Sequence, residues 1–281
     1  MEQKYGLEAI ASQVRRDIIR MVYNASSGHP GGSMSSTDIV VALFFKEMKH
    51  SPKNWRRDGV GSDLFFLSAG HMSPLFYSVL ARSGYFPLSY LATFRKLGSP
   101  LQGHPSTDQG LPGIHIASGS LGQGLSVANG AAVAKKMNGE ENFVYVLLGD
   151  GECQEGQVWE AALFAAHNRL NRLIAITDWN GQQIDGRIDD IMGMGDLTKK
   201  WEAFGWSCRE VEGNNMNSLL QALEWAKGAV ADPRPKMLLL NTTMGKGVDF
   251  MEDDNRWHGV APSEEQCRAA LEQLPETIGD F

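Results

Sequence analysis

The sequence contains little cysteine: Cys153, Cys208 and Cys267 are the only three in 281 residues. Because they lie far apart and form no CxxC pattern, they exclude a disulfide framework and favour a reducing compartment, the cytoplasm. The chain also lacks a run of 18 apolar residues, which excludes a membrane-spanning helix of the usual kind. Positive charge does not dominate either, since 33 acidic residues against 26 Lys and Arg leave a formal net charge of −7. This balance argues against nucleic acid as the main partner.

Helical and strand-like patterns alternate along the whole chain. Short apolar runs predict strands at 63–68, 143–148, 173–177, 206–211 and 236–242. Amphipathic or small-residue segments predict helices at 7–24, 35–48, 73–83, 122–137, 155–169, 196–204 and 217–231, with a helical tail after Pro262. The alternation predicts an α/β fold, a doubly wound parallel sheet with helices on both faces. No shift in composition marks a boundary, so we expect residues 1–281 to form a single domain.

The stretch LLGDGECQEG, at 147–156, ends one predicted strand with Asp150 between two glycines. Taken alone, a tight turn in which Asp150 caps the next helix explains it. Asn180 follows the next predicted strand, and its Asn-Gly pair alone also indicates a turn. Because the carboxyl ends of parallel strands share one edge of the sheet, the two side chains can converge on a divalent cation, which takes oxygen ligands. One carboxylate holds Mg²⁺ weakly, so the remaining ligands are expected from a diphosphate.

Four histidines lie in loops marked by glycine or proline. They are His29 in SGHPGGS, His71 in SAGHMSP, His104 in LQGHPS and His258 in RWHGVAP. A single loop histidine is most often solvated surface. Four in such loops indicate a place where backbone and imidazole approach a ligand closely. A cluster of this kind suits proton transfer near neutral pH and hydrogen bonding to a sugar.

Together, these motifs resemble the N-terminal, diphosphate-binding region of the transketolase family. The resemblance rests on SGHPGGS, LSAGHMSP, QGHP, ASGSLGQGLSVANGAA, LLGDGECQEGQVWEA, LIAITDWNGQQIDG and MGKGV…WHG, and it covers roughly residues 10–260. It implies the thiamine-diphosphate-binding fold, with thiamine diphosphate and Mg²⁺ (or Ca²⁺ or Mn²⁺) as cofactors. The implied reaction moves a two-carbon ketol unit from a ketose to an aldose, mainly as sugar phosphates. The pentose phosphate pathway and a dedicated pathway for an unusual sugar both fit.

The resemblance also implies roles for individual residues. The metal ligands would be Asp150, Asn180 and the backbone of Gln182. His29, His71 and His104 would face the reacting carbons and the substrate hydroxyls. Lys246 and His258 match late positions that close over the cofactor or the substrate. Cofactor contacts would come from His71, Gly119, Ser120, Leu121, Asp150, Gly151, Glu155, Asn180 and Lys246. Glu155 and Glu160 match acidic residues linked with the dimer interface, although charge at a helix N-terminus also explains them.

The sequence departs from the family pattern in two ways, and the second determines what we expect of its assembly. Many transketolases carry a further histidine three residues before the HG pair, where this chain has Asn255. A complete transketolase is also more than twice as long, and the missing parts include the pyrimidine-binding domain with its activating glutamate. We therefore expect one subunit of a split transketolase, active only with a partner that carries those parts, in a heterotetramer. The candidate partner surface comprises the helix at 122–138 and the segment Glu152 to Glu160.

Three alternatives remain open at this point. The α subunit of a 2-oxo acid dehydrogenase shares the cofactor motif, and a carboligating synthase of the same superfamily has similar histidine loops. A non-catalytic partner that kept the fold belongs to a different class of function. The intact Asp150 and Asn180 pair and the histidine set favour transketolase over these three.

Overall fold

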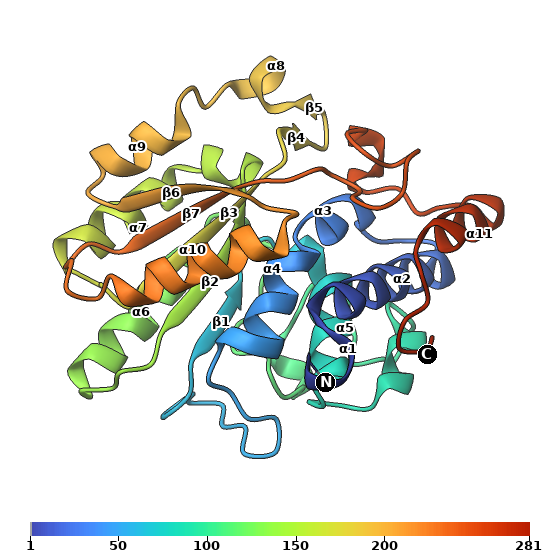
Figure 1. The fold of residues 1–281 in the computed structure, drawn as a ribbon, viewed down its shortest axis with the longest axis horizontal. Coiled ribbons are helices and arrows are strands. Elements are labelled where there is room, and N and C mark those ends of the chain that lie inside the picture. The colour runs from blue at the N-terminus through green and yellow to red at the C-terminus, as the bar shows by residue number, and fades with distance from the viewer. Residues whose placement is uncertain (1) are drawn as a thin grey trace.

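A five-stranded parallel sheet forms the centre of the molecule (Figure 1). The structure, a computed structural model, describes residues 2–281. The strands lie in the order β1-β2-β3-β7-β6, and every pair is parallel. Their bounds are β1 Leu64–Leu67, β2 Val144–Gly149, β3 Leu173–Trp179, β6 Ser207–Glu212 and β7 Lys236–Asn241. The predicted α/β fold with a parallel sheet is confirmed.

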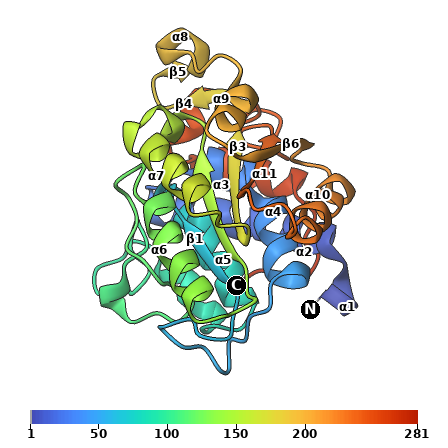
Figure 2. The same ribbon diagram turned by 90° about the vertical axis from the view of Figure 1, so that its left-hand side faces the viewer.

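Helices cover both faces of this sheet, as a doubly wound fold requires. One layer contains α2 (Leu7–Ala25), α3 (Pro30–Ser35), α4 (Thr37–Ala42), α5 (Ser73–Arg82), α10 (Met216–Gly228) and α11 (Glu264–Gln273), with the short α1 (Glu2–Tyr5) ahead of α2. The other layer contains α6 (Gly124–Met137), α7 (Gly156–His167), α8 (Ile188–Met192) and α9 (Leu197–Ala203). Figure 2 shows α6 and α7 on one side of the strands and α4 and α10 on the other.

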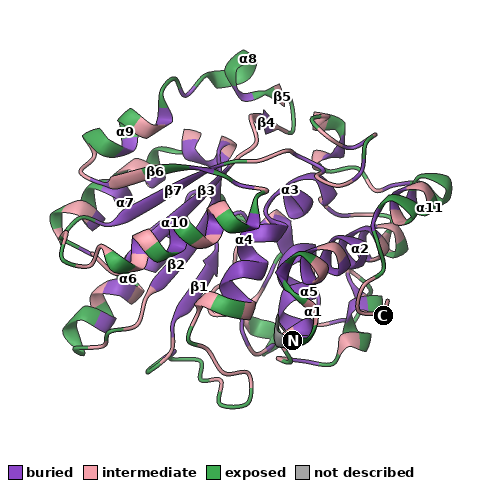
Figure 3. Ribbon diagram, viewed as in Figure 1, coloured by how far each residue is buried: buried purple, intermediate pink, exposed green. Residues whose placement is uncertain are grey.

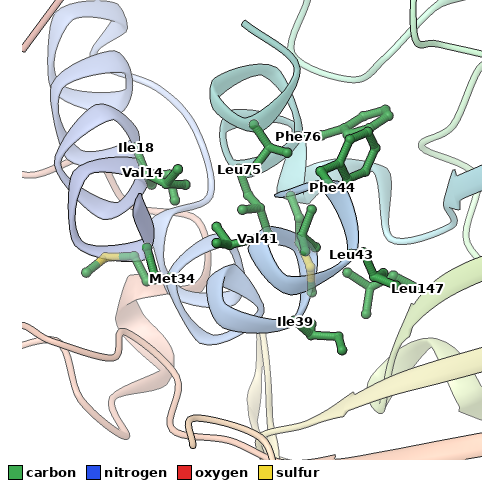
Figure 4. Packing of buried hydrophobic residues seen from close by; sticks show 14 of the residues in the cluster. Val14, Ile18, Met34, Ile39, Val41, Leu43, Phe44, Leu75, Phe76 and Leu147 are labelled. Carbon is green, nitrogen blue, oxygen red and sulfur yellow. The ribbon is translucent and has the colours of Figure 1, made fainter. Parts of the chain in front are cut away.

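Each face of the sheet has its own hydrophobic core, because successive side chains of a strand point to opposite faces. In β2, Tyr145 and Leu147 belong to the core under α2 to α5, whereas Val146 and Leu148 belong to the core under α6 and α7. The strands are therefore buried along their length, apart from the edge strand β6 (Figure 3). Figure 4 shows part of the first core, with Leu147 beside Leu43 and with Val14 and Ile18 of α2 farther away, on the other side of Val41.

The segment SGHPGGS differs from its expected loop conformation, because its last residues form the buried helix α3. Pro30 occupies the first helical position, where its fixed φ suits a helix start. Gly31 follows, and a Cβ there would lie 2.8 Å from Cγ of Met244 and 2.9 Å from the carbonyl oxygen of Trp257. The glycines thus permit close packing inside a helix. The sequence alone did not indicate this role, because glycine is more typical of loops. The predicted helix at 35–48 is also divided, into α4 and a π-helical turn at Leu43–Glu47.

The connections after β1 and β2 leave the sheet in opposite directions. The chain after β1 enters α5 on one face, and the chain after β2 enters α7 on the other face. In open α/β sheets, such a divergence leaves a crevice at the carboxyl ends of the strands, where ligands bind. The segment after β3 adds a small antiparallel hairpin, β4 (Gln182–Gln183) and β5 (Gly186–Arg187), beside this crevice. Within the described residues, 2–281, no helix has the length and apolar composition needed to cross a bilayer.

Candidate active site

A cavity of 190 Å³ lies at the carboxyl ends of β1, β2 and β3. Its walls come from the segments that follow these three strands and from the late segment around His258. Of the residues predicted from the sequence, it brings together His71, Leu121, Asp150, Gly151, Glu155, Asn180, Gln182 and His258. Residues separated by nearly 190 positions in the chain (71 to 258) thus share one small space because parallel strands end at one edge.

Asp150 follows β2 directly and is only 3% exposed. The N–H of Gly151 donates to its Oδ1 at 2.8 Å, and the N–H of Gly181 donates to its Oδ2 at 2.7 Å. Burial, together with the nearby carboxylate of Asp178, nevertheless raises the pKa of Asp150 to about 7. A bound cation would offset the cost of burying this charge, so the geometry suits a metal ligand.

Asn180 is held by its neighbours in one orientation. Its Nδ2 donates to Oδ2 of Asp178 at 3.0 Å, and its Oδ1 accepts from the N–H of Gln182 at 2.9 Å. Asp178 is fully buried at the end of β3 and also accepts hydrogen bonds from the hydroxyls of Ser35 and Thr242. Sequence reasoning missed Asp178, although a carboxylate inside the apolar run LIAITDW was a signal, since a buried charge needs several donors.

The four predicted histidines form one cluster, although they come from four separate segments. The ring centroid of His29 lies 5.3 Å from that of His71, 5.7 Å from that of His258 and 6.2 Å from that of His104. The rings of His71 and His258 are 5.0 Å apart. His29 immediately precedes α3, and His71 and His258 lie in 3₁₀ turns, so rigid local structure fixes three of the four.

Burial keeps these imidazoles neutral. It lowers the pKa of His29 to about 4 and that of His71 to about 3, and the neighbouring imidazoles act in the same direction. Burial also lowers the pKa of His104 and His258. A neutral imidazole offers one donor and one acceptor. The Nδ1 atoms of His29 and His258 are buried without a hydrogen-bond partner among the described residues, which is uncommon for buried polar atoms.

The lowered pKa of His71 predicts how stability depends on pH. Below the unfolded-state value near 6.5, the unfolded chain binds a proton that the folded chain excludes, so stability is lost as pH falls from 6.5 toward 3. The expected loss is about 1.4 kcal/mol per pH unit for this one group. Urea titrations between pH 7 and pH 5 measure the slope, and His71→Asn should flatten it. An equal slope in the variant would contradict the lowered pKa of His71 in the folded chain.

The loop at 119–121 approaches the histidine cluster closely. Gly119 has φ +139°, and a Cβ there would lie 3.2 Å from the ring of His104. Leu121 is 38% exposed and lines the cavity. Ser120 lines a separate hollow of 310 Å³, which it shares with Ser68 and Ser118. The loop therefore has one apolar side chain at the cavity and a backbone that a ligand can approach.

Comparison with known proteins identifies the family. Residues 7–276 match the thiamine diphosphate binding domain of transketolase. The chain belongs to the transketolase family. It is 40% identical over 275 residues to the 6-deoxy-6-sulfo-D-fructose transketolase subunit SqwG of Clostridium sp. (strain MSTE9), an alignment that covers 97% of this chain and 98% of that protein. It is 38% identical to an apulose-4-phosphate transketolase subunit from Actinobacillus succinogenes, over 96% of each chain.

Solved transketolase structures share the fold. The transketolase of Campylobacter jejuni superposes with a TM-score of 0.89 at 34% identity, over 95% of this chain and 42% of that one. The chain thus spans less than half of a solved transketolase but nearly the whole of the two relatives named as subunits. The predicted N-terminal transketolase chain is confirmed, in preference to a 2-oxo acid dehydrogenase chain.

Several positions taken from the transketolase motifs are not among the residues that line the cavity, including His29, His104, Gly119 and Ser120. Nζ of Lys246 pairs with Oε1 of Glu252 at 3.1 Å, and Lys246 is not among the lining residues. Asn255 donates from Nδ2 to the carbonyl of Ile184 at 3.4 Å and lines a neighbouring hollow of 630 Å³. Glu160 is exposed on α7. Glu152 is only 2% exposed, so its expected place on the partner surface is wrong.

Proposed function

We propose that this chain is the diphosphate-binding subunit of a two-subunit transketolase. The enzyme would transfer a two-carbon ketol unit from a ketose or ketose phosphate to an aldose or aldose phosphate. One observation carries the proposal: Asp150, Asn180, His71 and His258 line one cavity, and the rings of His29 and His104 cluster beside it. The chain also belongs to the transketolase family and matches named subunits along nearly their full length. We propose further that residues 1–281 form a single diphosphate-binding domain.

Thiamine diphosphate fits the chemistry of this cavity. When bound, it supplies the carbon nucleophile that accepts and releases the two-carbon unit. In this chain the loop Gly119 to Leu121 would contact it through its backbone and the Leu121 side chain. Gly151 would lie at the diphosphate, where the absence of a side chain permits close approach. Glu155 and His71, which also line the cavity, complete the proposed contacts.

The diphosphate would need a divalent cation here. The lining includes the carboxylates of Asp150, Glu152 and Glu155, and none of the lining residues within the described chain is Lys or Arg. A diphosphate would therefore meet negative charge unless a cation lay between them. Within residues 2–281, no group of three or more His, Cys, Asp or Glu side chains is arranged to hold a metal. The cation would thus rely on diphosphate oxygens as well as on protein ligands.

Mg²⁺ matches the donors that the chain does provide. These are the Asp150 carboxylate, the Asn180 amide oxygen and the backbone carbonyl of Gln182, all oxygen ligands of the kind that Mg²⁺ prefers. Ca²⁺ and Mn²⁺ accept the same donors. The hydrogen bond from Asn180 to Asp178 supports this role, because it directs the amide nitrogen away from the cation and leaves the oxygen as the available ligand.

The partner would carry the pyrimidine-binding domain and dock on the outer layer of α6 and α7. Apolar side chains there are solvent-exposed in this chain: Val127 is 41%, Leu163 is 58% and Phe164 is 48% exposed. Obligate interfaces bury about 2,000 Å² or more and are apolar. Closed twofold symmetry then gives two copies of each subunit, a heterotetramer. The three cysteines form no disulfide in the described chain, which supports a cytoplasmic enzyme.

A donor and acceptor screen tests the proposed reaction. The chain, co-purified with its partner subunit, is supplied with thiamine diphosphate, Mg²⁺, a series of ketose donors and a series of aldose acceptors. We expect two-carbon transfer, detected as a ketose product lengthened by two carbons relative to the acceptor. The donors should include phosphorylated and sulfonated ketoses. Cofactor binding without transfer from any donor would contradict the proposal.

The histidine cluster is expected to act on turnover rather than on cofactor binding. In the assembled enzyme, His29→Ala, His71→Ala and His104→Ala should each lower kcat/KM about 10²- to 10⁴-fold, the usual range for loss of a group that positions or moves a proton. Cofactor affinity should change less. His50→Gln is the control, because His50 stacks on Tyr85 outside the cluster. Near-normal kcat/KM in all three cluster variants would place the reacting centre elsewhere.

A further inference from the structure

Glu152 is a buried carboxylate that connects three segments around the cavity. Its Oε1 accepts a hydrogen bond from the N–H of Gly122 at 2.8 Å and another from the hydroxyl of Ser68. Its Oε2 accepts from the N–H of Gly149 at 3.1 Å. Ser68 follows β1, Gly149 ends β2, and Gly122 belongs to the loop that begins at Gly119. One side chain therefore fastens this loop to the ends of two neighbouring strands.

Ser68 adds a second hydrogen-bonded link between Glu152 and this loop. Its Oγ donates to Glu152 and accepts from the N–H of Gly124 at 3.1 Å. The loop can approach this closely only because it is built from glycine: a Cβ at Gly124 would lie 2.4 Å from Cβ of Ser68, and a Cβ at Gly122 would lie 2.9 Å from Cβ of Glu155. The glycines provide the room, and the Ser68 and Glu152 pair provides the hydrogen bonds.

We infer that Glu152, acting with Ser68, is a positioning residue that holds the loop Gly119–Gly124 against the turn that contains Asp150. The inference rests on the proposed cofactor site, because that loop and that turn form two of its walls. A carboxylate suits this place, since it is purely an acceptor and three donors point at it. If the loop is already ordered before the cofactor binds, binding does not have to pay the entropy of ordering the loop. Glu152 would therefore raise cofactor affinity without contacting the cofactor itself.

Glu152→Gln tests the inference with almost no change of shape. The amide replaces one acceptor oxygen with an NH₂ group, so at least one backbone N–H meets a donor and loses its partner. In the chain without cofactor, we expect the backbone amides of Gly122 and Gly124, which this network holds, to exchange hydrogen about 10- to 100-fold faster. Ser68→Ala keeps the carboxylate but removes the link to Gly124, so a smaller increase in the same loop is expected.

Asp63→Asn is the matched control. Asp63 is 4% exposed and likewise accepts from backbone N–H groups, those of Lys49 and Phe143, each at 2.8 Å. It precedes β1, at the opposite end of the sheet from Glu152. Its variant should speed exchange locally and lower thermal stability, but leave 119–124 unchanged. Faster exchange in this loop specific to Glu152→Gln therefore separates positioning from general destabilisation.

Cofactor titration of the assembled enzyme supplies the second readout. With saturating Mg²⁺, Glu152→Gln should bind thiamine diphosphate about 10- to 100-fold more weakly, with kcat near normal once the cofactor is saturating. Asp63→Asn should bind it as the wild type does. If Glu152→Gln matches Asp63→Asn in loop exchange and affinity, the positioning role is overturned. If the wild type does not bind the cofactor, the proposed site fails, and loop exchange alone decides the role of Glu152.

Discussion

Asp150→Ala is expected to abolish Mg²⁺-dependent binding of thiamine diphosphate while the chain keeps its fold. Asp150 is the only carboxylate among the proposed metal ligands, so its loss removes the one protein charge that holds the cation. We expect affinity to fall about 10²- to 10⁴-fold, because a buried charge pair that loses one partner costs about 3–5 kcal/mol. Asn180→Ala should act in the same direction but more weakly, since it removes a neutral ligand.

Stability without the cofactor gives this variant a distinctive signature. The pKa of Asp150 is raised to about 7 in the folded chain. The folded state therefore holds a proton that the unfolded chain releases near pH 4, and Asp150 makes stability fall as pH rises from about 4 to 7. Removing the side chain at pH 8 removes this cost along with its two hydrogen bonds, so the cofactor-free chain should remain folded. Most other active-site substitutions would also lose cofactor binding, but they would not remove a destabilising buried charge.

Calorimetry and thermal melts make both measurements on the same preparations. The assembled enzyme is titrated with thiamine diphosphate at saturating Mg²⁺, and the free chain is melted without either. Glu141→Ala serves as the control, since this carboxylate is 89% exposed. It should bind the cofactor as the wild type does. Unchanged affinity in Asp150→Ala would remove Asp150 from the metal site.

The sequence was informative where local pattern and topology act together. The apolar run that forms β2 ends at Gly149, so the position of Asp150 at the sheet edge follows from the strand assignment alone. The next strand ends at Trp179 and places Asn180 at the same edge. A parallel sheet then brings the two together without any knowledge of side-chain contacts. The histidines lie in loops and turns near that edge.

The parts that sequence reasoning missed depend on contacts between distant segments. Ser35 bonds to Asp178 across 143 positions, and Ser68 bonds to Glu152 across 84. No local spacing encodes such pairs. Helix α3 was missed for a related reason, because Gly31 permits close packing against Met244 and Trp257 rather than forming a turn. The supporting residues around the site are thus less visible in the sequence than the ligands themselves.

The second large effect concerns assembly: the purified single chain is expected to show no two-carbon transfer, and to gain it when the partner chain is added. The relatives that this chain matches end to end are named as transketolase subunits, whereas it covers 42% of a complete solved transketolase. In the proposed site, this chain would bind the diphosphate and present the histidines. The glutamate that activates the cofactor is expected from the partner, because the family places it in the pyrimidine-binding domain.

Substitutions on the outer layer should separate assembly from folding. Leu163 and Phe164 lie on α7 and are 58% and 48% exposed, so Leu163→Glu and Phe164→Glu should leave the free chain as stable as the wild type. Each should weaken association with the partner, because a charge buried in an apolar interface without a counter-charge costs several kcal/mol. Val60→Glu is the control, since Val60 is 49% exposed but precedes β1 at the other end of the sheet.

The assay combines sedimentation with activity at fixed concentrations of both subunits. We expect Leu163→Glu and Phe164→Glu to lose the heteromeric species and the activity together, and Val60→Glu to retain both. A high concentration of partner should restore activity in the α7 variants by mass action, because their catalytic residues are intact. Robust two-carbon transfer by the single chain would overturn the proposal of two subunits. Full assembly of the α7 variants would instead leave that proposal standing and move the partner surface away from α6 and α7.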